Sequence, residues 1–301
     1  MPTPDLAAEI LSIRRITMWG MLVNIFLAII KGVVGWIIHS LSLIADAFNS
    51  LSDIVTDIAV IWGSHWGSRP PDENHPFGHG KIETFISGVV IIGIIVVGAG
   101  VIVAAVQSLL GFVRAPLSGS MIMIIAGATI IVKELLYHKT LKVARIVRST
   151  ALKAKAWDHR GDVAVALVVL MGGLGTILKI QFADAVAGLI VGIIVLSVGF
   201  RLGKEVIVEL SEGAADRETL EQLNRVMASI PEIRGWHKLR TRRIGRQLHL
   251  DVHILLNPRL TVEEAHNIVR NIEDTLRSAT NWPIDPLVHV DPDNDEIRSK
   301  R

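Results

Sequence analysis

Long apolar stretches, separated by short polar segments, dominate the first two thirds of the chain. A helix needs about 20 mainly apolar residues to cross the hydrocarbon core of a membrane. Five stretches have about that length, and a shorter sixth follows a helix-compatible run that starts at Thr150. The pattern therefore predicts six membrane-spanning helices, at residues 13–38, 41–63, 85–110, 117–136, 163–178 and 183–202.

The pattern changes near Leu210, beyond which charged residues occur throughout. We therefore predict a transmembrane domain over residues 1–205 and a soluble domain over residues 206–301. An α-β-β-α-β order in the second domain predicts a small sheet with helices on one face, a ferredoxin-like or metallochaperone-like α+β domain. Helical periodicity covers 218–230 and 261–278, and strand-like patterns cover 236–244, 246–256 and 287–290.

Two local patterns add detail to the soluble domain. Thr261 is an N-cap residue, and Glu264, three residues later, completes a capping box. Alternate residues of a strand share a face, which separates an apolar set from a polar set along the second strand. We expect the apolar set to meet the helices and the histidines to be exposed. The two sets are Leu248, Leu250, Val252 and Ile254, and His249, Asp251 and His253.

Composition excludes several classes of function. The 301 residues include no cysteine, so any metal site must use oxygen and nitrogen ligands. The net charge of +2 is too small to indicate a nucleic-acid partner. The His-Glu-x-x-His pattern of a zinc metalloenzyme does not occur, and we expect neither an enzyme nor a prosthetic group. The first 12 residues lack the basic segment of a signal peptide.

The positions of Lys and Arg predict the orientation in the membrane, because cationic loops stay in the cytoplasm. Residues 39–42, between the first two predicted spans, carry neither residue type. We therefore expect both termini, and with them the soluble domain, to be cytoplasmic. The connection after the fourth span carries Lys139, Lys142, Arg145, Arg148, Lys153, Lys155 and Arg160.

Polar residues inside the predicted spans are the first candidates for function, since carboxylates at membrane depth are costly and usually face a pathway. Asn49 and Asp53 lie four residues apart on the second span, and Asp158 and Asp162 lie four apart at the start of the fifth. Residues at this spacing share a helix face. Two helices with such pairs can surround one cation, and an oxygen-rich set suits a hard or borderline divalent ion.

Other charges in the spans have simpler interpretations. Asp46 and Asp57 lie on the same face as Asn49 but near the span ends, where a carboxylate can cap a helix or reach water. Lys31 and Lys133 are expected to be snorkelling or paired structural charges.

The second connection contains another candidate site. Asp72, His75 and His79 are hard or borderline ligands within a loop short enough to close on one ion. A surface loop whose histidines bond to the backbone is an equally good interpretation of the spacing alone.

Two motifs in this region resemble those of the cation diffusion facilitator family. They are the run His75-Pro-Phe-Gly-His-Gly-Lys-Ile-Glu83 and the preceding Ser42-Leu-Ile-Ala-Asp-Ala-Phe-Asn-Ser-Leu-Ser-Asp53. The resemblance covers roughly residues 10–292, including six spans and the tail domain. It implies a homodimer in a bacterial inner membrane that exports divalent metal from the cytoplasm in exchange for protons.

The resemblance also implies residue roles. Asn49, Asp53, Asp158 and Asp162 match the transport site, and Asp72, His75 and His79 match the loop site. In the soluble domain, His237, His253, His289 and Asp291 match a cytoplasmic metal site, with His266 as an accessory ligand. Metal bound between two such domains would draw the dimer together.

One departure from the family pattern concerns the metal. Zinc-handling members usually place a histidine in the transport quartet, whereas this quartet is Asn, Asp, Asp and Asp, similar to that of bacterial manganese members. Oxygen ligands tolerate manganese better than zinc, so the expected cargo is manganese, then iron(II), then zinc. His159 lies about 100° around the helix from Asp158 and is not expected to create a zinc site.

A different class of function fits part of the sequence. The tail residues alone would suffice for a membrane-bound metal sensor or assembly scaffold that transports nothing. The intact transmembrane quartet favours the transporter.

Overall fold

The computed structural model describes residues 4–295 apart from 68, 70–71, 112–115, 147–149, 246 and 281–282. Side chains are described over the same residues, apart from those of 4–14, 55–67 and 150–151. The chain divides into two compact units. One unit joins Met1–Val60 to Val89–Gly203, and the other joins Ile61–Gly88 to Lys204–Arg301.

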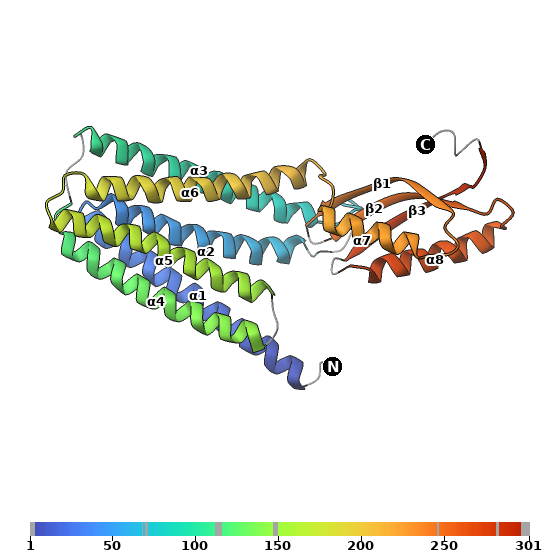
Figure 1. Cartoon of the computed structure of the whole chain (residues 1–301), viewed down its shortest axis with the longest axis horizontal. Coiled ribbons are helices and arrows are strands. Elements are labelled where there is room, and N and C mark those ends of the chain that lie inside the picture. The colour runs from blue at the N-terminus through green and yellow to red at the C-terminus, as the bar shows by residue number, and fades with distance from the viewer. Residues whose placement is uncertain are drawn as a thin grey trace. The chain divides into compact units, whose positions relative to one another are not determined.

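Six long helices follow one another along the first two thirds of the described chain (Figure 1). Five of them are long and apolar enough to cross a membrane. The remaining one, α2, has 27 residues and carries three aspartates. The helical transmembrane fold is thus confirmed, and the domain boundary expected at residue 205 falls inside α6. The helices are α1 (Pro4–Ile37), α2 (Leu41–Gly67), α3 (Gly80–Leu109), α4 (Gly119–Ile146), α5 (Thr150–Ile177) and α6 (Ala183–Leu210).

The core of the membrane unit consists of apolar side chains that lie between the helices. Leu43, Ile122 and Val169 are fully buried there and come from α2, α4 and α5. Large apolar side chains such as Phe26 and Ile124 are instead exposed, as expected of helices whose outer faces meet lipid. Apolar residues therefore occupy both the inside and the outside of this unit.

Glycines let α5 approach its neighbours closely. A Cβ atom added at Gly173 would lie 2.8 Å from Ile122 of α4, and one at Gly172 would lie 2.6 Å from Ala187 of α6. Both distances are too short for carbon atoms, so these positions require glycine. Small residues at helix contacts are typical of membrane proteins, and here they place α5 between α4 and α6.

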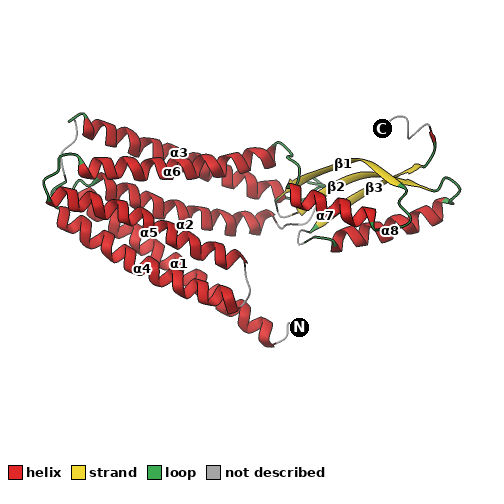
Figure 2. Cartoon of the chain, in the orientation of Figure 1, coloured by secondary structure: helices red, strands yellow, loops and turns green. Residues whose placement is uncertain are grey.

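The C-terminal part has the predicted α-β-β-α-β order (Figure 2). β1 pairs antiparallel with β2, and β2 pairs parallel with β3, so β2 is the central strand. The last strand is longer than its pattern predicted because it pairs with β2 over nine consecutive residues. The elements are α7 (Arg217–Ala228), β1 (Gly235–Ile244), β2 (Gln247–Leu256), α8 (Val262–Ser278) and β3 (Ile284–Pro292).

Both helices of this domain cover one face of the sheet (Figure 2). The predicted apolar face of β2 forms the core, where Leu250 and Ile254 pack with Leu223 of α7 and Leu276 of α8. The capping box of α8 is present, with the Thr261 hydroxyl accepting the Glu264 N–H and the Glu264 carboxylate accepting the Thr261 N–H. Periodicity and capping therefore predicted this domain correctly.

One expectation for the sheet is wrong. His249 was expected to be exposed, but only 8% of it is accessible. Its Nδ1 lies 3.1 Å from Asp285 Oδ2, on the neighbouring residue of β3. Because β2 is the central strand, a side chain on its second face has neighbours on both adjacent strands, which the alternation along one strand does not reveal.

Candidate metal sites

The four predicted transport ligands line one cavity of about 370 Å³ in the membrane unit. Asn49 and Asp53 come from successive turns of α2, and Asp158 and Asp162 from successive turns of α5. Asn49 Nδ2 donates a hydrogen bond to Asp162 Oδ1 at 3.0 Å, which joins the two pairs. The i, i+4 spacing orients each pair along its helix, and the packing of the bundle brings the pairs together.

The cavity has apolar walls beside its carboxylates. Ile94, Val165 and Val195 line it, and Lys155 and Arg201 contribute cationic side chains. Apolar surroundings have a low effective dielectric constant and strengthen the attraction between a carboxylate and a cation. Such a cavity can attract a divalent cation and strip part of its water shell.

His159 does not line this cavity. It is buried, 3% accessible, and its ring points toward α1, where a Cβ atom at Gly20 would lie 3.7 Å from its Nε2. This placement agrees with the expectation from the helical wheel that His159 adds no nitrogen ligand to the quartet.

Two lysines in the membrane unit are fully buried and ion-paired, so neither snorkels to the surface. Lys31 Nζ lies 2.8 Å from Asp46 Oδ2 and 3.1 Å from Ser50 Oγ. Lys133 Nζ lies 2.5 Å from Asp162 Oδ2 and 2.8 Å from Asn24 Oδ1. Asp46 is thereby engaged in an ion pair outside the cavity, whereas the partner of Lys133 is one of the predicted transport ligands.

The loop residues form a compact cluster in the second unit. Asp72 Oδ1 lies 3.2 Å from His75 Nδ1, and Asp72 Oδ2 lies 3.3 Å from His79 Nε2. The two rings are 4.4 Å apart between centroids. Ligand atoms of all three residues lie within 4.8 Å of one another, which is the spacing of a group that can close on one metal ion.

Backbone hydrogen bonds stabilise the ionised form of the Asp72 carboxylate. Its Oδ1 accepts the backbone N–H of His75 at 2.7 Å and that of Asn74 at 3.0 Å. These hydrogen bonds, that of His75 foremost, lower the pKa of Asp72. The carboxylate therefore needs no deprotonation at neutral pH to bind a cation.

The predicted tail ligands come together on the sheet face opposite the helices. His237, His253 and His289 occupy one row across β1, β2 and β3. Asp291 connects them, because its carboxylate lies 2.9 Å from His253 Nδ1, 3.3 Å from His237 Nε2 and 3.4 Å from His289 Nε2. Partial burial opposes ionisation of Asp291, but the hydrogen bond from His253 and the nearby histidine charges lower its pKa overall.

His266 stands apart from this row. It lies on α8, on the helical side of the sheet, and is exposed. Of the described histidines, only His237 and His253 form a group with Asp291 whose ligand atoms all lie within 4.8 Å of one another. His289 lies beside this group, with its Nε2 3.4 Å from Asp291 Oδ1. A role for His266 stays a prediction.

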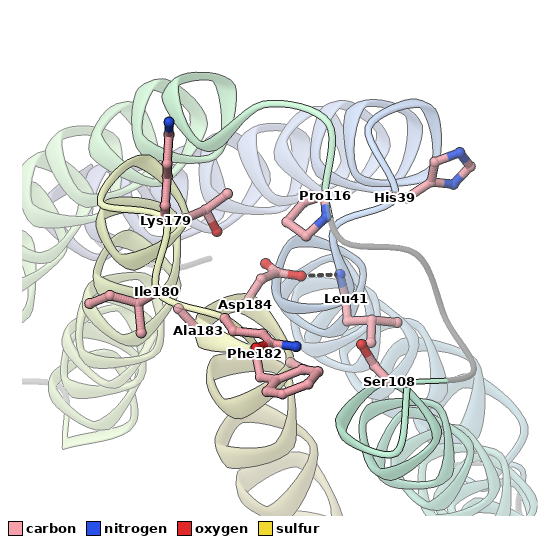
Figure 3. Close-up of a pocket in the computed structure, with 13 residues that line it drawn as sticks. His39, Leu41, Ser108, Pro116, Lys179, Ile180, Phe182, Ala183 and Asp184 are labelled. Carbon is pink, nitrogen blue, oxygen red and sulfur yellow. Dashed lines mark hydrogen bonds between the residues drawn. The ribbon is translucent and has the colours of Figure 1, made fainter.

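A second cavity, of about 620 Å³, contains a buried carboxylate that the sequence analysis did not single out (Figure 3). Asp184, 3% accessible, accepts hydrogen bonds from Leu41 N at 2.7 Å, from Ser40 Oγ at 2.7 Å and from Ser42 Oγ. Leu41 is the first residue of α2, and Asp184 itself lies in the first turn of α6. One carboxylate thus stabilises the N-terminal ends of two helices.

The membrane helices, the carboxylate-lined cavity and the two histidine clusters define a multi-pass membrane protein of the divalent metal transporter class. A model of the cation efflux transmembrane domain matches residues 18–211. A model of the cytoplasmic domain of cation efflux proteins matches residues 215–293. The chain belongs to the cation efflux family, the cation diffusion facilitators.

Several known proteins are similar along nearly the whole chain. Metal tolerance protein C1 of Arabidopsis thaliana is 30% identical over 293 residues, which cover 93% of this chain and 62% of the plant protein. Manganese efflux system protein MneP of Bacillus subtilis is 28% identical over 287 residues, covering 93% of this chain and 96% of MneP. This chain therefore spans less than two thirds of the plant relative but almost all of the bacterial one.

Among solved structures, the metal-bound C-terminal domain of the CzcD transporter from Thermotoga maritima is similar to the tail. It is 22% identical, with a TM-score of 0.25, and covers 27% of this chain and 99% of that domain.

Proposed function

We propose that the protein exports a divalent transition-metal cation from the cytoplasm in exchange for protons. The observation that carries the proposal is the convergence of Asn49, Asp53, Asp158 and Asp162 on one cavity between membrane helices. Three carboxylates at membrane depth are costly unless they serve a cation pathway. Because a carboxylate must be deprotonated to bind metal, metal binding and proton release are coupled at such a site.

Manganese is the first choice of cargo, followed by iron(II) and zinc. The four ligands offer oxygen atoms, and the described lining of the cavity contains no histidine. Oxygen ligands suit manganese, while imidazole favours zinc. The similarity to MneP, a manganese efflux protein that is 28% identical to this chain, supports the same choice.

The loop and tail clusters serve as accessory metal sites in this proposal, and the working form is a homodimer in a bacterial inner membrane with both termini in the cytoplasm. Asp72, His75 and His79 form the loop site. His237, His253, His289 and Asp291 form the tail site, where metal binding favours closure of two tail domains. A matching model of a cytoplasmic dimerisation domain supports the dimer.

Transport into proteoliposomes with an imposed proton gradient tests the proposal. Wild type is compared with Asp53→Asn, which keeps the shape of the side chain but removes its charge. Glu134→Gln is the matched control, since Glu134 is a carboxylate of α4 that pairs with His138 at 3.3 Å and does not line the cavity. Manganese, iron(II) and zinc are offered separately.

We expect manganese movement that requires the gradient, is lost in Asp53→Asn and persists in Glu134→Gln. A preference for zinc would show that the manganese assignment is wrong. Metal transport that does not depend on the proton gradient would refute the antiporter mechanism. If a folded dimer moves none of the three metals, the sensor or scaffold becomes the better description, and the tail cluster its working part.

A further inference from the structure

A buried cation contacts one of the four residues predicted to bind metal in the transport cavity. Lys133 lies in α4 and is fully buried, with 0% of its surface accessible. Its ammonium group contacts Asp162 Oδ2 at 2.5 Å and Asn24 Oδ1, from α1, at 2.8 Å. A buried ammonium is retained only where charged and polar partners compensate for its lost hydration.

Both oxygens of Asp162 are engaged by donors of the protein itself. Oδ2 accepts from Lys133, and Oδ1 accepts from Asn49 Nδ2 at 3.0 Å. A metal ion coordinated by Asp162 needs one of these oxygens and repels the ammonium beside it. Metal and Lys133 are therefore alternative cationic partners of the same carboxylate.

We propose that Lys133 is a tethered cation that competes with the transported metal for Asp162, and that Asn24 holds Lys133 when the metal takes its place. The proposal rests on the function proposed above for the quartet. It makes Lys133 and Asn24 positioning residues that set how tightly the cavity holds its cargo. A cavity that holds metal too tightly releases it slowly, so the competing ammonium favours turnover.

The two residues have opposite effects on affinity. Without the ammonium, as in Lys133→Met, the metal has no internal competitor at Asp162 and binds more tightly. Without the Asn24 amide, as in Asn24→Leu, the ammonium depends on Asp162 alone and competes more strongly. A merely structural role for this network would instead reduce the number of active molecules in both variants, with KM unchanged.

Saturation kinetics of manganese transport in proteoliposomes separate these cases. We expect Lys133→Met to lower KM at least about tenfold, the equivalent of 1.4 kcal/mol, and to lower the turnover rate. Asn24→Leu is expected to raise KM. Lys31→Met is the matched control, because it removes an equally buried ammonium whose partner Asp46 lies outside the cavity, and it should leave KM within about twofold of wild type.

The single variant Asp162→Asn keeps this proposal separate from the proposed function. If Asp162→Asn transports with the KM of wild type, the assignment of the cavity itself is wrong. If Asp162→Asn loses saturable transport while Lys133→Met leaves KM unchanged, only the tethered cation is refuted. The tethered cation would also be refuted if KM changed in the same direction in Lys133→Met and Asn24→Leu. Should Lys133→Met fail to fold, Asn24→Leu decides by the direction of its KM change.

Discussion

The carboxylate of Asp184 forms hydrogen bonds with the start of α2, the helix that carries Asn49 and Asp53. It accepts three hydrogen bonds from residues 40–42, one of them from the first backbone N–H of α2 (Figure 3). Asp184→Ala removes all three acceptor contacts at once and leaves the donors buried. We expect this to be one of the most destabilising single substitutions in the membrane unit.

The magnitude follows from the contacts. A hydrogen bond to a charged group contributes about 1.5–3 kcal/mol, but three bonds to one carboxylate are not additive, so we expect a loss of about 3–5 kcal/mol for Asp184→Ala. Asp184→Asn keeps one oxygen for the serine hydroxyls but places an amide donor opposite Leu41 N–H, at a cost of about 2 kcal/mol. Ser42→Ala removes a single neutral donor, at a cost of about 1 kcal/mol.

Thermal unfolding of the purified full chain in detergent measures the series. With about 2–4 °C of Tm per kcal/mol for a unit of this size, Asp184→Ala lowers Tm by roughly 10 °C, and the two milder variants fall in order between it and wild type. The KM for metal should also change in Asp184→Ala, since α2 presents half of the quartet. An Asp184→Ala protein with the Tm of Ser42→Ala would refute the role assigned to this carboxylate.

Three further predictions concern the tail domain. Asp291→Asn should weaken metal binding at the tail cluster at least about tenfold, which equilibrium dialysis of the full chain would report as one fewer tight site; an unchanged stoichiometry would contradict it. Thr261 N–H and hydroxyl bonds lower the pKa of Glu264 below its ordinary 4.5, so the stability it contributes is complete above pH 4.5 and lost as pH falls through the lowered pKa; melts of wild type and Glu264→Ala should therefore differ at pH 7 and converge in acid. Leu250→Ala, at a fully buried position, should cost about 2–5 kcal/mol, whereas Val262→Ala, at a position 89% exposed, should cost less than about 0.5 kcal/mol in the same denaturation assay.

Sequence alone determined the local features of this protein. The lengths of the apolar stretches predicted the membrane helices, because a bilayer imposes a minimum length on each. Alternation placed Leu248, Leu250, Val252 and Ile254 on the inner face of β2, and the Thr261–Glu264 pair predicted the start of α8. Each of these features depends on neighbours within a few residues along the chain, so the order of residues contains the whole signal.

Sequence also selected candidate ligands but not their surroundings. The spacing of Asp158 and Asp162 fixes their common helix face, since it depends on one helix only. Which helix faces them depends on how the bundle packs, and the small residues Gly172 and Gly173 decide that packing by letting α5 approach α6 and α4.

Only the tertiary structure revealed the contacts between distant residues. Lys133 and its neighbour Glu134 are charged residues in an otherwise apolar stretch, and nothing near them in the sequence indicates that the partners of Lys133 are Asp162 and Asn24, 29 and 109 residues away. Asp184 is 143 residues from the backbone N–H that it caps. Burial of a charge forces it to find a partner, but the identity of that partner is decided by which helices lie side by side, and that is a property of the packed bundle.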